Sequence, residues 1–198
     1  MQSCKSEMAA SPAQMTIAIS PNFTGEKLAS GKLADMIDVF EDQMRGWLID
    51  PANQLIPHQH AGFGILAIVL SYFEPIGQFL EGKAGKSKPL FTRGLKAVFP
   101  DLEKNVSAKI INELYDQLRC GMFHHGITKS KVVIAPNGPH SLGVAWGPKG
   151  ELRQIVVVPR HLMAHLENHL TKYVGDLRDP ANKKLRENFK KWFKKRAA

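Results

Sequence analysis

The chain has 198 residues, with a hydrophobic fraction of 43% and a charged fraction of 23%. These values are near the average of folded soluble proteins, and the length predicts one compact domain with enough chain for a real core. The two cysteines, Cys4 and Cys120, argue against a disulfide framework and favour a reducing, cytoplasmic setting.

The net charge of +9 is unevenly distributed along the chain. Eight basic residues and one acidic residue lie between Lys183 and Arg196, so this segment carries +7 of the total. Such a segment suits a polyanion such as RNA, DNA or an anionic membrane surface. The alternative is a solvated helix that only keeps the protein soluble.

The first 30 residues, 1–30, are rich in Ser, Pro, Ala and Gly and show little periodicity. We therefore expect a loosely ordered N-terminus, in which Met15–Ser20 (MTIAIS) predicts at most a short strand. The first residues lack the apolar core of a signal peptide.

Helical periodicity starts at Lys32, with apolar residues at three- and four-residue steps. Pro51 and Pro57 predict a break after this first helix. A second helix is expected from about His60 to Leu80, with a kink at Pro75.

The most apolar stretch of the chain is AGFGILAIVLSYF, residues Ala61–Phe73, which carries no charge and meets Glu74 directly. It is shorter than the roughly 20 residues that a membrane-spanning helix needs. We therefore expect a buried core helix and no membrane association.

The segment EGKAGKSKP, Glu81–Pro89, predicts a flexible basic loop before a short helix at Phe91–Val98. Its GKS triplet looks like the end of a phosphate-binding P-loop. That motif would need a glycine at position 80, where Leu80 stands, and a strand rather than a helix before it. A solvated linker is the better interpretation.

The strongest helical pattern follows Asp101, which is a suitable N-cap residue. One apolar stripe marks the face of this helix that we expect to be buried: Val106, Ile110, Ile111, Leu114 and Leu118. Gly126 predicts the end of the helix.

The next segment changes to β-type patterning. Three β-branched runs lie within Lys131–Val158, separated by PNGPHS and GPKGE, and predict a three-stranded antiparallel meander. Helical periodicity returns from Pro159 to Tyr173.

The pair Asp179-Pro180 predicts the start of a last, basic amphipathic helix over residues 179–198. Its aromatic residues recur at helical spacing, so we expect them to dock on the core and to leave the lysines exposed. The alternative is that these aromatics stack on single-stranded nucleic acid.

Three histidines, His161, His165 and His169, share one face of a helix at four-residue steps. Two such histidines can chelate zinc, but a site needs further ligands, and the neighbouring leucines explain the helix without metal. His58 and His60 lie in a loop and are weaker candidates. We therefore predict no metal and no other cofactor.

The stretch LYDQLRCGMFHHG places Arg119 close to His124 and His125. Metal-independent RNA cleavage needs a group that moves protons, which suits histidine, and a cation for the five-coordinate phosphate, which suits arginine. At about 100° per residue, His124 lies about 140° around an ideal helix from Arg119, and His125 falls near Leu118, toward the core. Arg119 and His124 therefore converge only if the helix loosens near Gly121 or if two chains combine their motifs.

The motif RCGMFHHG, late in a long helix, resembles the Arg-x(4–6)-His signature of the HEPN superfamily, whose members are helical bundles and in many cases metal-independent endoribonucleases. The resemblance implies that Arg119 binds the scissile phosphate and that His124 handles a proton. His125 also satisfies the family spacing. The resemblance further implies a homodimer in which two such motifs face each other. The family usually has Asn, Asp or His after the arginine, where this chain has Cys120.

We therefore expect a mainly α (α+β) protein, with one HEPN-like helical bundle over residues 31–178 that includes the meander. The first expected function is a metal-independent endoribonuclease of a toxin–antitoxin or defence type, acting on RNA, with a cognate antitoxin or another partner protein. The alternative is a non-catalytic HEPN-like module that binds nucleic acid, nucleotide or a partner protein. The candidate nucleic-acid-binding residues are Lys183, Lys184, Arg186, Lys190, Lys191, Lys194 and Lys195.

Overall fold

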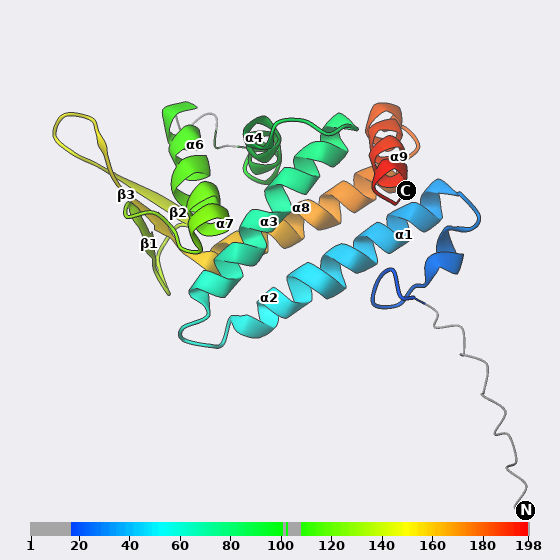
Figure 1. Ribbon diagram of the computed structural model, residues 1–198, viewed down its shortest axis with the longest axis horizontal. Coiled ribbons are helices and arrows are strands. Elements are labelled where there is room, and N and C mark those ends of the chain that lie inside the picture. Colours follow the sequence, from blue (N-terminus) through cyan, green and yellow to red (C-terminus); the bar gives the residue numbers. More distant parts are fainter. Residues whose placement is uncertain (1–16, 101, 103–107, 198) are drawn as a thin grey trace, which may run out of the picture.

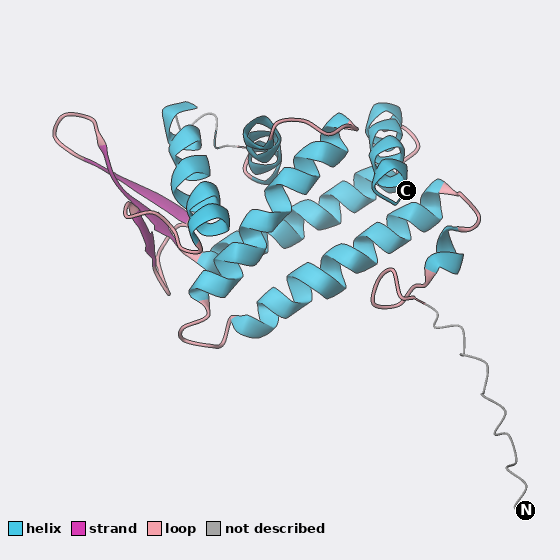
Figure 2. Ribbon diagram, viewed as in Figure 1, coloured by secondary structure: helices cyan, strands magenta, loops and turns pink. Residues whose placement is uncertain are grey.

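The computed structural model describes residues 17–100, 102 and 108–197. Long helices run alongside one another, shorter helices cross them, and a small sheet lies at one end of the molecule (Figure 1). Helices make up most of the described chain (Figure 2), so the protein belongs to the α+β class.

The N-terminal part of the described chain forms a turn rather than a regular strand. Of the strand expected at Met15–Ser20, the described residues form a single antiparallel bridge between Ala18 and Thr24, and Met15 lies outside the described residues. A short 3-10 helix, Gly25–Leu28, follows.

The first long helix continues past Pro51, whereas the break is confirmed at Pro57, which lies in the turn before the next helix. Helix α1 (Leu33–Met44) passes through a π-helical turn, Arg45–Ile49, into α2 (Asp50–Leu55). The break expected at Pro51 was wrong, because this proline lies in the first turn of α2, where its missing N–H and its fixed φ are tolerated.

Helix α3 (Gly62–Glu81) carries the apolar stretch and continues through Pro75. Nine of its residues are buried, and it ends at Gly82, whose φ of 67° is the left-handed conformation that glycine adopts readily. By length and composition alone, α3 is the one helix of the described chain that could cross a membrane, and half of its most apolar window is buried inside the protein.

Helix α4 (Ser87–Val98) packs closely against α3. It begins four residues before the predicted start at Phe91, so the loop expected at Glu81–Pro89 is shorter than predicted. Gly94 of α4 touches the backbone of α3 so closely that a Cβ there would overlap the carbonyl oxygen of Phe73.

The helix with the predicted apolar stripe consists of α6 (Ala108–Leu114), a π-helical turn (Tyr115–Cys120) and α7 (Gly121–His125). It ends at Gly126 in the left-handed conformation, as predicted. Its stripe is confirmed where the structure describes it, since these residues are buried: Ile110, Ile111, Leu114 and Leu118. The expected cap Asp101 and the stripe residue Val106 lie outside the described residues.

The sheet is mixed rather than an antiparallel meander. Its strands β1 (Val132–Ile134), β2 (Leu142–Trp146) and β3 (Leu152–Val157) lie in the order β1-β3-β2. β3 pairs with β2 antiparallel but with β1 in parallel. A tight hairpin between β1 and β2 is disfavoured because Pro136 and Pro139 flank the Asn-Gly pair and have no N–H for a ladder.

Helix α8 (Pro159–Arg178) extends beyond the predicted Tyr173, and α9 (Lys183–Ala197) begins later than predicted. Asp179 does not cap α9. Its Oδ1 instead accepts a hydrogen bond from the N–H of Ala181, 2.9 Å away, and forms a turn between the two helices.

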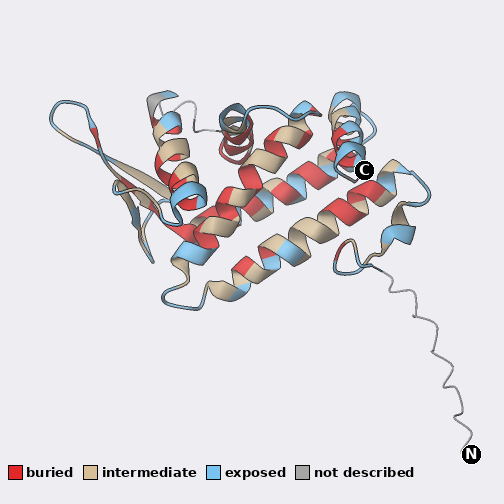
Figure 3. Ribbon diagram, viewed as in Figure 1, coloured by how far each residue is buried: buried red, intermediate tan, exposed pale blue. Residues whose placement is uncertain are grey.

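The aromatic side chains of α9 dock on the core, as expected from their helical spacing. Phe189 is fully buried, and its ring centroid lies 5.3 Å from that of Phe40 on α1 and 5.2 Å from that of Phe79 on α3. Trp192 and Phe193 are also buried. Figure 3 shows the buried stripe of α9 facing the other helices and its exposed side facing solvent.

Candidate functional site

The helix that carries the Arg–His motif loosens just before Gly121. In the π-helical turn Tyr115–Cys120, the N–H of Gly121 bonds to the carbonyl of Asp116, five residues earlier. Such a turn holds one residue more than an α-helical turn, and so it rotates the following helix about the axis. Arg119 Nη1 consequently lies 3.1 Å from His124 Nε2 within a single chain.

Arg119 is held in place by a carboxylate from α3. Its Nη2 lies 3.0 Å from Glu74 Oε2, and the two side chains are 19% and 24% exposed, so water screens this ion pair only in part. The guanidinium also lies over the rings of Tyr115 and Phe123, at 5.8 and 5.4 Å from their centroids.

The same carboxylate oxygen joins Arg119 to a further pair of hydroxyls. Ser87 Oγ donates to Glu74 Oε2 over 2.6 Å, and Tyr115 Oη donates to Ser87 Oγ over 3.1 Å. Side chains from α3, the start of α4 and the π-helical turn therefore form one hydrogen-bonded chain that ends at His124. These hydrogen bonds fix the plane of the guanidinium.

The hydrogen bond between Arg119 and His124 fixes the state of the histidine. Arginine only donates hydrogen bonds, so Nε2 of His124 accepts and carries no proton in this arrangement. The imidazole is exposed to solvent. A cavity of about 290 Å³ beside Arg119 and Phe123 gives a small ligand group access to the arginine.

His125 does not join this cluster. The side chain is exposed rather than turned toward the core, because the π-helical turn changes the angle at which α7 leaves the helix. Within the described part of the chain, His125 makes no side-chain hydrogen bond or ion pair. Of the three catalytic candidates, the structure brings Arg119 and His124 together and leaves His125 apart.

Gly121 allows the chain to fold back over the motif. A Cβ at this position would lie 2.8 Å from the backbone nitrogen of Lys129 and 3.0 Å from the carbonyl oxygen of Ile127. The N–H of Lys129 bonds to the carbonyl of Gln117, 3.0 Å away. The loop after α7 therefore packs directly on the π-helical turn.

Helix α9 lies toward the other end of the long axis from α7 (Figure 1). Six of its candidate lysines are exposed, and none forms an ion pair with another described residue: Lys183, Lys184, Lys190, Lys191, Lys194 and Lys195. Arg186 is different, since its Nη1 donates to the carbonyl of Leu177 over 2.5 Å at the end of α8. The lysines thus form an open basic surface, and Arg186 supports the helix junction.

Two histidines of α8, His165 and His169, pack against aromatic residues. His169 Nδ1 lies 2.9 Å from Tyr72 Oη, and burial lowers the pKa of His169 to about 4. His165 packs against Phe99, and burial lowers its pKa as well. Among the described residues, no three His, Cys, Asp or Glu side chains gather closely enough to hold a metal ion.

Sequence reasoning missed three residues of the cluster: Glu74, Ser87 and Tyr115. One signal was available for the first of them. Glu74 directly follows an uncharged core stretch, and a carboxylate in that position needs a cation or hydrogen-bond donors nearby. Ser87 was assigned to a loop, although it is the first residue of α4.

Comparisons of this chain with models of protein families, with curated proteins and with solved structures found no match. Three features of the described chain define the candidate site. They are an arginine held by a carboxylate, an imidazole nitrogen 3.1 Å from that arginine, and a small cavity beside the arginine and the carboxylate.

Proposed function

We propose that the protein is a metal-independent endoribonuclease of the HEPN type that uses Arg119 and His124. The observation that carries this proposal is the 3.1 Å approach of Arg119 Nη1 to His124 Nε2 at an exposed position. An arginine and an imidazole at this distance can contact the same phosphodiester group.

In the proposed reaction, the 2′-oxygen of RNA attacks the adjacent phosphorus atom, and the bond from phosphorus to the 5′-oxygen breaks. The leaving 5′-oxygen takes up a proton from water, so the products are a 2′,3′-cyclic phosphate and a free 5′-hydroxyl. His124 Nε2 is unprotonated in the hydrogen bond with Arg119, so it suits the acceptance of the 2′-hydroxyl proton. When a phosphate enters, Arg119 exchanges the imidazole for phosphate oxygens and stabilises their additional charge.

The contacts of Glu74 support this role of Arg119, although the residue after the arginine differs from the one usual in the HEPN superfamily. Cys120 occupies the position of the usual polar residue after the arginine. Glu74, Ser87 and Tyr115 orient the guanidinium from neighbouring elements instead. A preorganised cation loses little conformational freedom when it binds a phosphate.

The test is cleavage of varied RNAs by purified protein in EDTA, with analysis of the product ends. We expect wild-type cleavage that leaves cyclic phosphate, and a loss of about 10²-fold or more in His124→Ala and Arg119→Ala. His140→Ala is the matched control, since this exposed histidine lies in the β1–β2 loop. Equal background cleavage by wild type and His124→Ala would overturn the proposal.

The homodimer implied by the HEPN resemblance belongs to the same proposal. Exposed Phe123 and Ile127, 48% and 62% exposed, lie next to the candidate site and suit contact with a second copy. Light scattering of wild type and Phe123→Ser tests this. We expect a dimer that weakens in the variant, and a wild type that stays monomeric at all concentrations would refute the dimer.

A second candidate is an RNA-binding module without turnover, favoured by the six exposed lysines of α9. If all six contact phosphates of single-stranded RNA, the slope of log K against log salt concentration is about −4. We expect replacement of the four lysines at 190, 191, 194 and 195 by Gln to reduce the slope by about 3. An unchanged slope would exclude α9 as the binding surface.

A further inference from the structure

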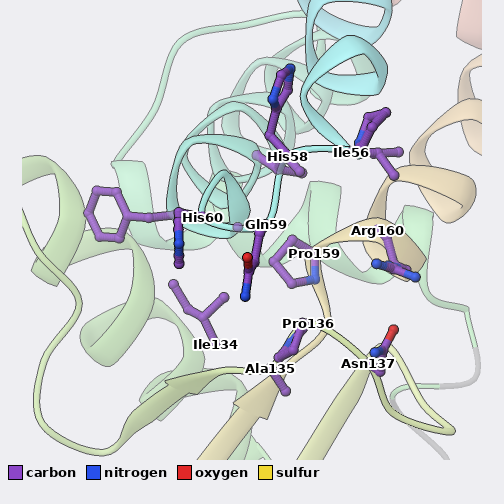
Figure 4. A pocket seen from close by; sticks show the side chains of 14 residues that line it. Ile56, His58, Gln59, His60, Ile134, Ala135, Pro136, Asn137, Pro159 and Arg160 are labelled. Carbon is purple, nitrogen blue, oxygen red and sulfur yellow. The ribbon is translucent and has the colours of Figure 1, made fainter.

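A cavity of about 700 Å³ lies away from the Arg119–His124 cluster. Three segments form it: the connection from α2 to α3, the residues that follow β1, and the start of α8 (Figure 4). It shares no lining residue with the smaller cavity beside Arg119. Its volume is in the range of small-molecule sites.

The cavity has a floor set by close packing of distant segments. A Cβ on Gly62 would lie 2.9 Å from the side chain of Ile134, so the start of α3 and the end of β1 touch. Ile65 and Pro159 continue this apolar floor. Ile134 takes this position because β1 pairs in parallel with β3. Its partner in β3 is Val157, which lies two residues before the start of α8.

Four polar side chains of the cavity fall into two sets, and the side chain of His58 lies apart from both. In Figure 4, the guanidinium of Arg160 and the amide of Asn137 lie near each other on one side, and the side chains of Gln59 and His60 lie on the other side, with Pro159 between the sets. One set therefore offers a cation with an amide, and the other offers an amide with a flat ring.

The charge around the cavity is positive without a balancing acid. All the residues that line it are described, and none of them is Asp or Glu. Arg160 lies in the first turn of α8, which contains no acidic residue and has no side-chain cap. The positive end of a helix dipole normally favours an anion, so a cationic side chain there leaves an unneutralised positive region.

We propose that this cavity binds a nucleoside monophosphate. The phosphate lies between Arg160, Asn137 and the first turn of α8. The base lies against the apolar floor, with its edge hydrogen-bonded to Gln59 and its face against the ring of His60. A divalent cation is disfavoured in the same place, because Arg160 repels it and no carboxylate lines the cavity.

The site is independent of the proposed ribonuclease, and calorimetry tests it on the full chain. The ligands are AMP, GMP, CMP and UMP. Adenosine and inorganic phosphate are tested separately as the two parts of AMP. We expect at least one nucleotide to bind with Kd below about 1 mM, at least tenfold more tightly than either part. If no nucleotide binds in that range, or if inorganic phosphate binds equally well, the proposal is wrong.

Variants locate the binding. We expect Arg160→Gln to raise Kd at least tenfold, and Asn137→Ala tests the same end if Arg160→Gln does not fold. Arg153→Gln is the matched control, since this exposed arginine of β3 does not line the cavity. Arg119→Ala is expected to leave Kd unchanged. Unchanged affinity in folded Arg160→Gln and Asn137→Ala would overturn the assignment, and lost affinity in Arg119→Ala would move the site to the Arg119–His124 cluster.

Discussion

The largest pH effect on stability that we derive comes from His169 on α8. Tyr72 Oη lies 2.9 Å from His169 Nδ1, and burial keeps the phenol protonated by raising its pKa, so the phenol donates to the imidazole. Burial is also the first cause that lowers the pKa of His169 to about 4, from an ordinary value of 6.5. The nearby positive charge of Lys172 acts in the same direction.

The sign of this pH effect depends on whether the folded or the unfolded chain binds more protons. Between about pH 6.5 and about pH 4, the imidazole is protonated in the unfolded chain and neutral in the folded chain. The unfolded state therefore binds more protons, and the free energy of unfolding falls as the pH falls through this window. At 1.36 kcal/mol for each pKa unit, His169 removes about 3 kcal/mol of stability between neutral pH and about pH 4.

The perturbation is His169→Gln, which keeps a side-chain amide for Tyr72 but does not titrate. Carboxylates also change charge in this range, so the informative quantity is the difference between variant and wild type, from urea unfolding at several pH values. We expect the variant to gain about 3 kcal/mol relative to wild type from about pH 7 to about pH 4. His140→Gln is the control and should run parallel to wild type. If the His169→Gln and wild-type curves also run parallel, within about 0.5 kcal/mol, the buried neutral imidazole is refuted.

Three further predictions concern the helix contact and the candidate site. Gly94→Ala should lower the free energy of unfolding in urea by about 3 kcal/mol, because the new Cβ overlaps the carbonyl of Phe73 and forces α3 and α4 apart; an unchanged unfolding midpoint would contradict this. Gly121→Ala should cost about 1–3 kcal/mol by the same measurement, because its Cβ meets the backbone of Lys129 at 2.8 Å. It should also reduce RNA cleavage at a temperature where the variant is fully folded, and full cleavage there would show that the loop does not position the motif. Glu74→Gln removes the charge that holds the guanidinium 3.0 Å away and should reduce RNA cleavage by about 10-fold to 100-fold with an unchanged circular dichroism spectrum; wild-type cleavage would exclude a positioning role.

Helix content and core faces could be predicted because they depend on local periodicity. The stripe that includes Leu114 and Leu118 is buried as expected, and so are the aromatic residues of α9. In each case, apolar residues at 3.6-residue spacing form one face of the helix, and the helix buries that face by packing it against the core. The ends of the helices were predicted less well. Pro51 and Ser87 lie in the first turns of α2 and α4, and their conformations depend on the residues before them.

The sheet could not be predicted in the same way, because strand pairing is non-local. Adjacent β-branched runs with turn residues between them favour a meander, and the β2–β3 hairpin does form. The partner of β1 is decided instead by the two prolines after it and by the contact of Ile134 with the start of α3. Since the cavity with Arg160 depends on that pairing, no local pattern could indicate it.

The Arg–His pair shows most directly why residue spacing alone does not define a site. In an ideal α-helix, a separation of five residues places the second side chain about 140° away from the first. Here the helix departs from ideal geometry, since the π-helical turn Tyr115–Cys120 runs into α7 between the two residues, and Arg119 Nη1 lies 3.1 Å from His124 Nε2. Such a turn gives up regular hydrogen bonding, and the N–H of Lys129 bonds here to the carbonyl of Gln117. The chain forms a second π-helical turn at Arg45–Ile49, away from the Arg–His pair, so the turn at Tyr115–Cys120 accounts for the geometry of the pair and not for its function.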